Sequence, residues 1–167
     1  MPTPNPHSPP VRVVEADLDH PAHQEAIVTL TDAYARDPMG DGAPLPTAVR
    51  KALIGGLRQH PTTMVFLAFA GEEAVGLANC FRGFSTFTAR PLVNVHDLVV
   101  PAEYRGRGIG RLLLDAVEGK ARAIGCCKLT LEVTEGNAVA RHLYERVGFA
   151  RSTYGKGGGL LVYAKEL

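Results

Sequence analysis

The sequence has no tryptophan, few cysteines and little excess charge of either sign. Its 167 residues include 18 Lys+Arg against 17 Asp+Glu, so the formal net charge is +1. A chain so balanced lacks the basic surface of nucleic-acid binders and of polybasic membrane-surface proteins, so we expect neither partner. No apolar run reaches the roughly 20 residues of a membrane span, and the start of the chain lacks the apolar core of a signal peptide. We therefore expect a cytoplasmic protein with a small-molecule partner.

The three cysteines do not form a recognisable redox or metal-binding pattern. Cys126 and Cys127 are adjacent and Cys80 is isolated, which suits neither a CxxC redox pair nor a zinc knuckle. We expect all three to be small apolar residues of the core, and we expect no metal.

Hydrophobic periodicity divides the chain into strands and helices. The prolines of residues 1–10 predict an extended tail, and the remaining 11–167 predict a single domain. Strands are expected over residues 11–14, 64–70, 74–81, 92–100, 128–133 and 160–164. Helical patterns follow Pro21, include 49–57, and lie between the glycines at 110 and 125 and between Asn137 and Gly148. This order is typical of one mixed α/β domain.

A glycine-rich turn follows the expected strand 92–100 and precedes a helix. Gly106, Gly108 and Gly110 leave the backbone open to a ligand, and the first N–H groups of the helix attract an anion. The arginines beside them add positive charge, so phosphate or pyrophosphate is the expected guest. The spacing fits neither a Walker A loop nor the Gly-x-Gly-x-x-Gly dinucleotide fingerprint. A turn that merely joins strand to helix is the alternative.

The turn is part of a longer pattern. Arg105-x-x-Gly108-x-Gly110 follows an apolar strand, Asn137 and Tyr144 come seven residues apart, and Gly148-Phe149 follows. This pattern, strongest over residues 93–149, resembles the GNAT superfamily of acetyl-CoA-dependent N-acetyltransferases. The resemblance implies a central, mostly antiparallel mixed sheet flanked by helices, whose fourth and fifth strands splay apart around the cofactor.

The resemblance also implies a role for each residue of the pattern. The strand 98–100 would pair with the pantetheine arm of acetyl-CoA, and 106–111 would hold its pyrophosphate. Tyr144 would stand beside the sulfur, where a hydroxyl can protonate the departing thiolate; packing in the core is the alternative. The residues expected at the cofactor are Leu98, Val99, Val100, Arg105, Gly106, Arg107, Gly108, Ile109, Gly110, Arg111, Asn137 and Tyr144.

His96 and Asp97 interrupt an apolar strand and are candidates for proton transfer. An amine nucleophile must lose a proton, so the reaction needs a base or a water chain to one. Without a bulge only one of the two side chains can point into an acceptor pocket, because strand residues alternate; His96 would then share a face with Leu98. We expect His96 to be the catalytic base, with a buried histidine bonded to backbone as the alternative. Asp97 would be structural or would orient His96.

Residues 84–87 and 92–100 look like the corresponding stretch of spermidine/spermine acetyltransferases, where a glutamate base matches His96. Those relatives have an aspartate in place of Thr86. Arg82 and Arg90 would favour an acceptor with a carboxylate if they faced the pocket, although solvated arginines are the simpler alternative.

The sequence therefore predicts an enzyme that moves the acetyl group of acetyl-CoA to a primary amine of a small molecule by direct attack. The alternatives are a polyamine or diamine acetyltransferase specifically, or a non-catalytic acyl-CoA sensor. Many members of the superfamily dimerise, so the resemblance also implies a homodimer.

Overall fold

Seven strands form one sheet in the order β1-β2-β3-β4-β5-β7-β6. The computed structural model describes residues 9–152 and 160–166, so most of the predicted tail lies outside the described residues. Every neighbouring pair is antiparallel except β4 and β5, which confirms the predicted mixed sheet. The strands are β1 (Val11–Glu15), β2 (Thr63–Ala70), β3 (Glu73–Ser85), β4 (Arg90–Val99), β5 (Lys128–Thr134), β6 (Ala150–Ser152) and β7 (Leu160–Glu166).

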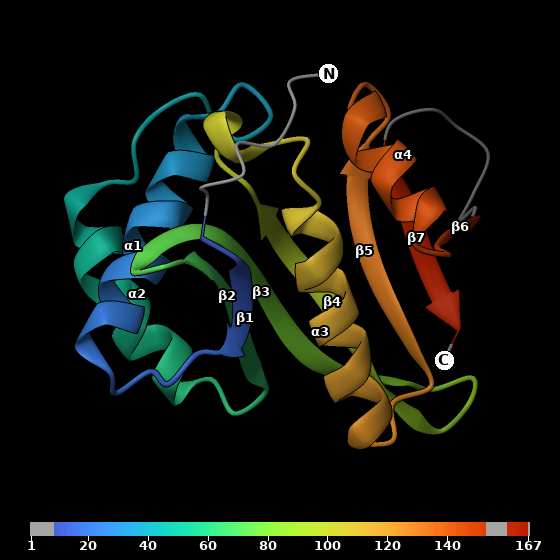
Figure 1. Cartoon of the computed structure of the whole chain (residues 1–167). Helices are drawn as coiled ribbons and strands as arrows, with labels where there is room; N and C mark the ends of the chain where they lie inside the picture. The colour runs from blue at the N-terminus through green and yellow to red at the C-terminus, as the bar shows by residue number, and fades with distance from the viewer. Residues whose placement is uncertain (1–8, 153–159, 167) are drawn as a thin grey trace.

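Helices cover both faces of this sheet and give it two hydrophobic cores. We call these faces the α1–α2 face and the α3–α4 face. Figure 1 shows α3 crossing in front of the middle of the sheet with α4 in front of β7, and α1 and α2 side by side at the left. The helices are α1 (Pro21–Arg36), α2 (Thr47–Gln59), the short 3₁₀ helix η1 (Ala102–Tyr104), α3 (Ile109–Ala123) and α4 (Ala138–Arg146).

Local sequence signals set most of these boundaries. Gly125 and Gly148 adopt left-handed backbone angles, with φ of 76° and 92°, just after α3 and α4 end. The side chain of Asn137 accepts a hydrogen bond from the N–H of Ala140 at 3.1 Å and caps α4, as its sequence position predicts. The three cysteines are buried, with exposed fractions of 0 to 5%, so their predicted place in the core is confirmed.

Strands β4 and β5 pair only briefly. Their parallel ladder joins Val93–Val95 to Leu129–Leu131 and goes no further. Beyond it the two strands separate, and β5 continues its pairing with β7 instead. The predicted splay is therefore confirmed, and we call the gap between residues 96–99 of β4 and residues 132–134 of β5 the opening.

Two elements were missing from the sequence prediction. Strand β6 pairs with β7 over only three residues, from Ala150 opposite Ala164 to Ser152 opposite Val162, which is too short for any periodicity to show. Helix η1 is a single turn after Pro101. The β3–β4 hairpin is also longer than predicted, because its ladder continues to the pair of Ser85 and Arg90.

Candidate active site

The glycine-rich turn lies at the N-terminus of α3, beside the opening. Gly106 and Gly108 have φ of 78° and 80°, a left-handed conformation that other residues rarely adopt. A Cβ atom placed on either glycine would find no protein atom within 4 Å. The backbone of this turn is therefore accessible from outside.

The N–H groups of this turn are available to a ligand. The bond from the Leu112 N–H to the Gly108 carbonyl, 3.1 Å long, is the first one into α3. Within residues 9–152 and 160–166, the backbone N–H groups of residues 106–111 donate to no protein acceptor. Free N–H groups and the positive end of a helix dipole together suit an anion such as phosphate.

Arg105 binds protein groups on both sides of the turn. Its Nε donates to the Val100 carbonyl at 2.9 Å, and its Nη2 donates to Oδ2 of Asp37 at 2.6 Å. The N–H of Met39, and then Arg105, lower the pKa of Asp37 below its usual range. The side chain of Arg105 thus ties the end of β4 to the C-terminus of α1.

The other two arginines of the turn also contact protein groups. Arg107 donates from Nη2 to the Glu103 carbonyl at 3.0 Å, and its guanidinium lies 5.3 Å from the centre of the Tyr104 ring. Arg111 forms a long ion pair of 3.7 Å with Asp115 one turn along α3. All three predicted arginines therefore surround the turn, and their contact with a phosphate stays a prediction.

Ile109 and Gly110 serve the packing of α3. Ile109 is 2% exposed and its side chain lies in the α3–α4 core, so only its backbone faces the turn. A Cβ on Gly110 would lie 2.8 Å from Leu143 of α4 and 4.0 Å from Leu98 and Val100. Glycine at this position allows α3 to approach α4 across the opening.

The end of β4 offers an unpaired edge. Leu98 and Val100 pack against the α3–α4 core, and Val99 is buried in the opposite core. Their strand is bonded to β3 on one side, whereas on the other side its ladder with β5 has already ended at Val95. An extended ligand could pair with this edge as an added strand would.

Tyr144 points into the α3–α4 core from α4. It is 7% exposed, and its ring lies 5.9 Å from that of Phe149 and 6.1 Å from that of Tyr163. Burial, with a smaller contribution from Tyr34, raises the pKa of Tyr144 to about 12. The phenol therefore keeps its proton throughout the neutral range and can donate it.

Strand β4 contains a bulge at His96. Asn79 of β3 pairs with Asp97, and the next residue, Cys80, pairs with Val95, so His96 has no partner in the ladder. His96 is exposed, so the alternative prediction of a buried histidine is wrong. The bulge lies where β4 leaves β5, at the edge of the opening.

The bulge brings His96 and Asp97 to the same face of the sheet. The His96 ring meets the Phe81 ring edge-on at 5.5 Å, and Phe81 packs against the α1–α2 core. Asp97 lies on this face too, since Val99, two residues later, belongs to the same core. The predicted alternation, with His96 on the face of Leu98 and Asp97 on the other, is wrong because one extra residue shifts the phase.

Tyr34 of α1 completes the site, and the sequence analysis missed it as a functional residue. Burial and then the charge of Asp97 raise the pKa of Tyr34. Tyr34 packs with the α1–α2 core and Tyr144 lies in the α3–α4 core, yet Tyr34 contributes to the raised pKa of Tyr144. Tyr34 thus acts on Tyr144 from the opposite face of the sheet. In the sequence Tyr34 only continues the apolar stripe of its helix.

Comparison with known proteins identifies the family. The sequence profile of the acetyltransferase (GNAT) family matches residues 27–149. The chain belongs to this family. The match includes the opening, the glycine-rich turn, the bulge and both tyrosines.

Individual relatives of this GNAT chain share parts of its sequence or its fold. It is 40% identical over 80 residues to streptothricin acetyltransferase of Streptomyces lavendulae, a match that covers 46% of this chain and only 42% of that protein. A probable acetyltransferase of known structure superposes with a TM-score of 0.75 at 26% identity, over 87% of this chain and 94% of the other. A chain of the NatC complex bound to Gag peptide and CoA superposes with a TM-score of 0.71 at 20% identity, over 94% and 98%. These matches do not distinguish the spermidine/spermine branch from others.

Arg82 and Arg90 of the GNAT chain lie away from the bulge. They are exposed near the β3–β4 hairpin, where Arg90 donates to the Gly125 carbonyl at 3.3 Å. Burial raises the pKa of the Cys126 thiol, and the charges of Arg82 and Arg90 act against that rise. Both arginines are exposed, as the simpler alternative of solvated arginines predicts.

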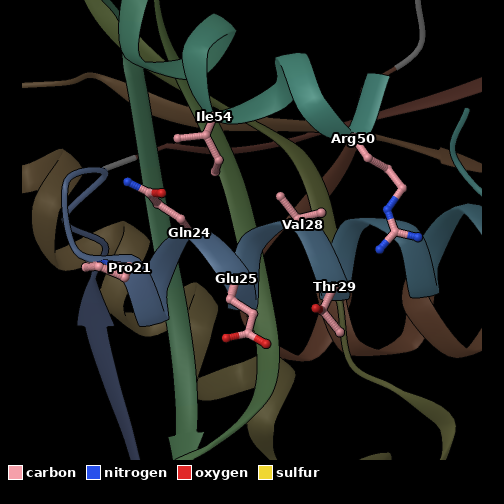
Figure 2. A pocket seen from close by; sticks show the side chains of 7 residues that line it. All are labelled: Pro21, Gln24, Glu25, Val28, Thr29, Arg50 and Ile54. Carbon is pink, nitrogen blue, oxygen red and sulfur yellow. The ribbon is translucent and has the colours of Figure 1, made fainter. Parts of the chain in front are cut away.

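A groove of about 410 Å³ lies on the outer surface of the GNAT chain, between α1 and α2 (Figure 2). Its lining residues are Pro21, Gln24, Glu25, Val28, Thr29, Arg50 and Ile54. None of them is a predicted site residue, and Arg50 also pairs with Asp32 at 3.5 Å. The groove is separate from the opening.

Two features are absent from the described part of the GNAT chain. No helix there is long and apolar enough to span a bilayer. In the same residues, no three or more His, Cys, Asp or Glu side chains gather in a way that could bind a metal ion.

Proposed function

We propose that this chain is an acetyl-CoA-dependent N-acetyltransferase that acts on a primary amine of a small molecule. The observation that carries the proposal is the opening itself. Its α3–α4 side holds Tyr144 and the glycine-rich turn with its free N–H groups, and its α1–α2 side holds Tyr34 and the bulge at His96. The family match supports acetyl transfer, and the CoA in the NatC neighbour supports the co-substrate. The name of the streptothricin relative supports a small-molecule acceptor.

Acetyl-CoA fits the geometry of the α3–α4 side. Its pyrophosphate would meet the N–H groups of residues 106–111, over the open space at Gly106 and Gly108. Its pantetheine arm would pair with the free edge of β4 beyond Val95. This arrangement directs the thioester toward the opening and Tyr144.

The acceptor would approach from the α1–α2 side. Its nitrogen attacks the thioester carbonyl carbon, a C–N bond forms and the C–S bond breaks. The ammonium first gives one proton to His96, directly or through water, which frees the nitrogen lone pair for attack. The departing thiolate takes the proton of the Tyr144 hydroxyl, and the second proton that the nitrogen loses as the amide forms restores that hydroxyl through water. Exposure of His96 at the bulge suits a base that must exchange protons with solvent.

Two alternatives remain within the proposal. A polyamine or diamine acceptor is compatible with Asp97 on the α1–α2 face, since a carboxylate there attracts cations. A non-catalytic acyl-CoA sensor would use the turn alone and would need neither the bulge nor Tyr144.

Two measurements test the proposed function. Acetyl-CoA should raise the melting temperature in proportion to the logarithm of its concentration, whereas NADH and ATP should do much less. Free-thiol release from acetyl-CoA should follow the addition of at least one amine among spermidine, 1,4-diaminobutane, L-lysine, streptothricin and a peptide with a free N-terminus. A thermal shift without thiol release would favour the sensor, and a larger shift with NADH or ATP would contradict the assignment of the turn.

A further inference from the structure

One buried polar atom beside the bulge has no partner. Asn79 is 3% exposed, and its Nδ2 donates to Oδ2 of Asp97 at 3.0 Å. Its Oδ1 is shielded from solvent and accepts no hydrogen bond from the described residues. A buried acceptor without a donor destabilises a protein, so such groups are uncommon in folded chains.

The register explains why this asparagine meets the aspartate. The bulge at His96 places Asn79 directly opposite Asp97, on the α1–α2 face. Without the extra residue Asn79 would face His96, and the carboxylate would lie on the other side of the sheet. The amide of Asn79 can satisfy only one oxygen of Asp97, which leaves the other oxygen free for a further donor.

The residues around Asp97 indicate which kind of donor its free carboxylate oxygen could bind. Tyr34 packs from α1 against the α1–α2 core, which also contains Leu77 and Val99, each two residues from Asn79 and Asp97 respectively. Burial and then the charge of Asp97 raise the pKa of Tyr34. His96 precedes Asp97 on β4, and its side chain lies on the same face of the sheet. Carboxylate and phenol oxygens together suit a group with several N–H donors and a positive charge.

We propose that Asn79 is a positioning residue that aims the Asp97 carboxylate at Tyr34, so that the two receive the ammonium group of the acceptor. This inference rests on the proposed function and adds how the acceptor is held before His96 takes its proton. Asn79 itself touches neither the acceptor nor acetyl-CoA. The unpartnered Oδ1 is then the cost of turning the amide toward Asp97 as a donor.

The unpartnered oxygen allows a sharp test, because one substitution should improve stability while it impairs function. In Asp97→Asn the new amide can donate to Oδ1 of Asn79 and accept from its Nδ2, so the unpartnered Oδ1 gains a donor. We expect its melting temperature to rise by about 2–4 °C. With the charge gone, the KM for the amine should rise roughly 10- to 100-fold.

Asn79→Leu provides the complementary change. Leucine has a similar shape but no amide, so Asp97 loses its donor and the carboxylate is no longer held. We expect a comparable rise in amine KM with a smaller change in kcat and an unchanged thermal shift by acetyl-CoA. Because both variants act on one carboxylate, the double variant should have the amine KM of Asp97→Asn alone.

Asn94→Ala is the matched control. Asn94 lies on β4, as Asp97 does, but its amide donates to the carbonyl and hydroxyl oxygens of Thr130 at 3.4 and 3.1 Å. Its removal should lower stability and leave the amine KM unchanged. Thiol release is measured with the same five amines that test the proposed function, alongside melting curves with and without acetyl-CoA.

The outcomes separate the inference from the proposed function. If the wild-type chain releases thiol and both Asp97→Asn and Asn79→Leu retain the wild-type amine KM, the inference is wrong and the proposed function stands. A lower melting temperature in Asp97→Asn likewise overturns it, since that result makes the pair a structural contact. If the wild-type chain releases no thiol with any of the five amines, the proposed function fails with the inference.

Discussion

The two sides of the opening present different parts of the chain. On the α3–α4 side the glycine-rich turn presents the free backbone N–H groups of residues 106–111, while the nearby side chains of Arg105 and Arg107 bind protein carbonyls. On the α1–α2 side the backbone is bonded into the sheet, and the bulge presents the side chains of His96 and Asp97. A backbone cradle fits any phosphate, whereas a set of side chains can select one acceptor. Substitutions on the two sides should therefore have separable effects.

The largest expected effect comes from closing the backbone cradle. In Gly108→Val, a branched side chain would occupy the open space over the turn, so the thermal shift by acetyl-CoA should disappear. Valine in the left-handed region also costs roughly 1–2 kcal/mol of stability. Gly125→Val controls for that strain, since Gly125 has φ of 76° and open space but lies at the other end of α3. An acetyl-CoA shift retained by Gly108→Val would show that the turn does not hold the cofactor.

The next largest effect concerns the hydroxyl proton of Tyr144, which the departing thiolate is proposed to take. Tyr144→Phe keeps the ring, so acetyl-CoA should still stabilise the fold, but turnover should fall roughly 10- to 1,000-fold. Tyr163→Phe is the control, because this neighbouring buried tyrosine binds Arg141 and Glu145 and lies outside the proposed chemistry. Equal turnover in Tyr144→Phe and wild type would make Tyr144 a packing residue.

The raised pKa of Tyr144 gives the same prediction a pH dependence. A phenol with its pKa at about 12 keeps its proton where an ordinary tyrosine, near 10, begins to lose it. Wild-type turnover at saturating amine should therefore persist through pH 10 and decline only as the pH approaches 12. A decline centred near pH 10 would instead indicate a donor with an ordinary pKa.

A smaller effect is expected on the acceptor side from the base. His96→Ala should lower the rate at limiting amine roughly 10- to 100-fold, while acetyl-CoA still raises the melting temperature. His96→Glu should retain part of the activity. His60→Ala is the control, because the His60 ring also packs on Phe81, at 5.0 Å, but away from the bulge. A full rate in His96→Ala would exclude His96 as the base.

The smallest effect tests the link between the sides. If Arg105 acts by holding Asp37, then Arg105→Gln and Asp37→Asn should each raise the amine KM by only about 2- to 5-fold, since an exposed ion pair is weak. The double variant should be no worse than either one. A loss of acetyl-CoA affinity in Arg105→Gln alone would mean that Arg105 binds the cofactor directly, as the sequence pattern suggests.

Local signals in the sequence were enough for most of the fold. The step from helical to alternating periodicity, Asn137 as a cap and Gly125 as a terminator all act within a few residues of where they stand. The splay of β4 from β5 followed from the family pattern rather than from any local signal. Strand β6 was missed because three residues at a sheet edge carry no period.

The sequence by itself determined the backbone side of the site, since a run of alternating glycines at a helix start has the same consequence in any fold. Only the tertiary structure decided which side chains meet on the α1–α2 side of the opening. The bulge that turns both His96 and Asp97 to one face arises from the pairing of β4 with β3, and it leaves no mark in the alternation of residues 92–100. Asn79 reaches Asp97 from β3, and Tyr34 packs from α1 on the same face of the sheet, so their proposed roles depend on contacts between segments far apart in the chain.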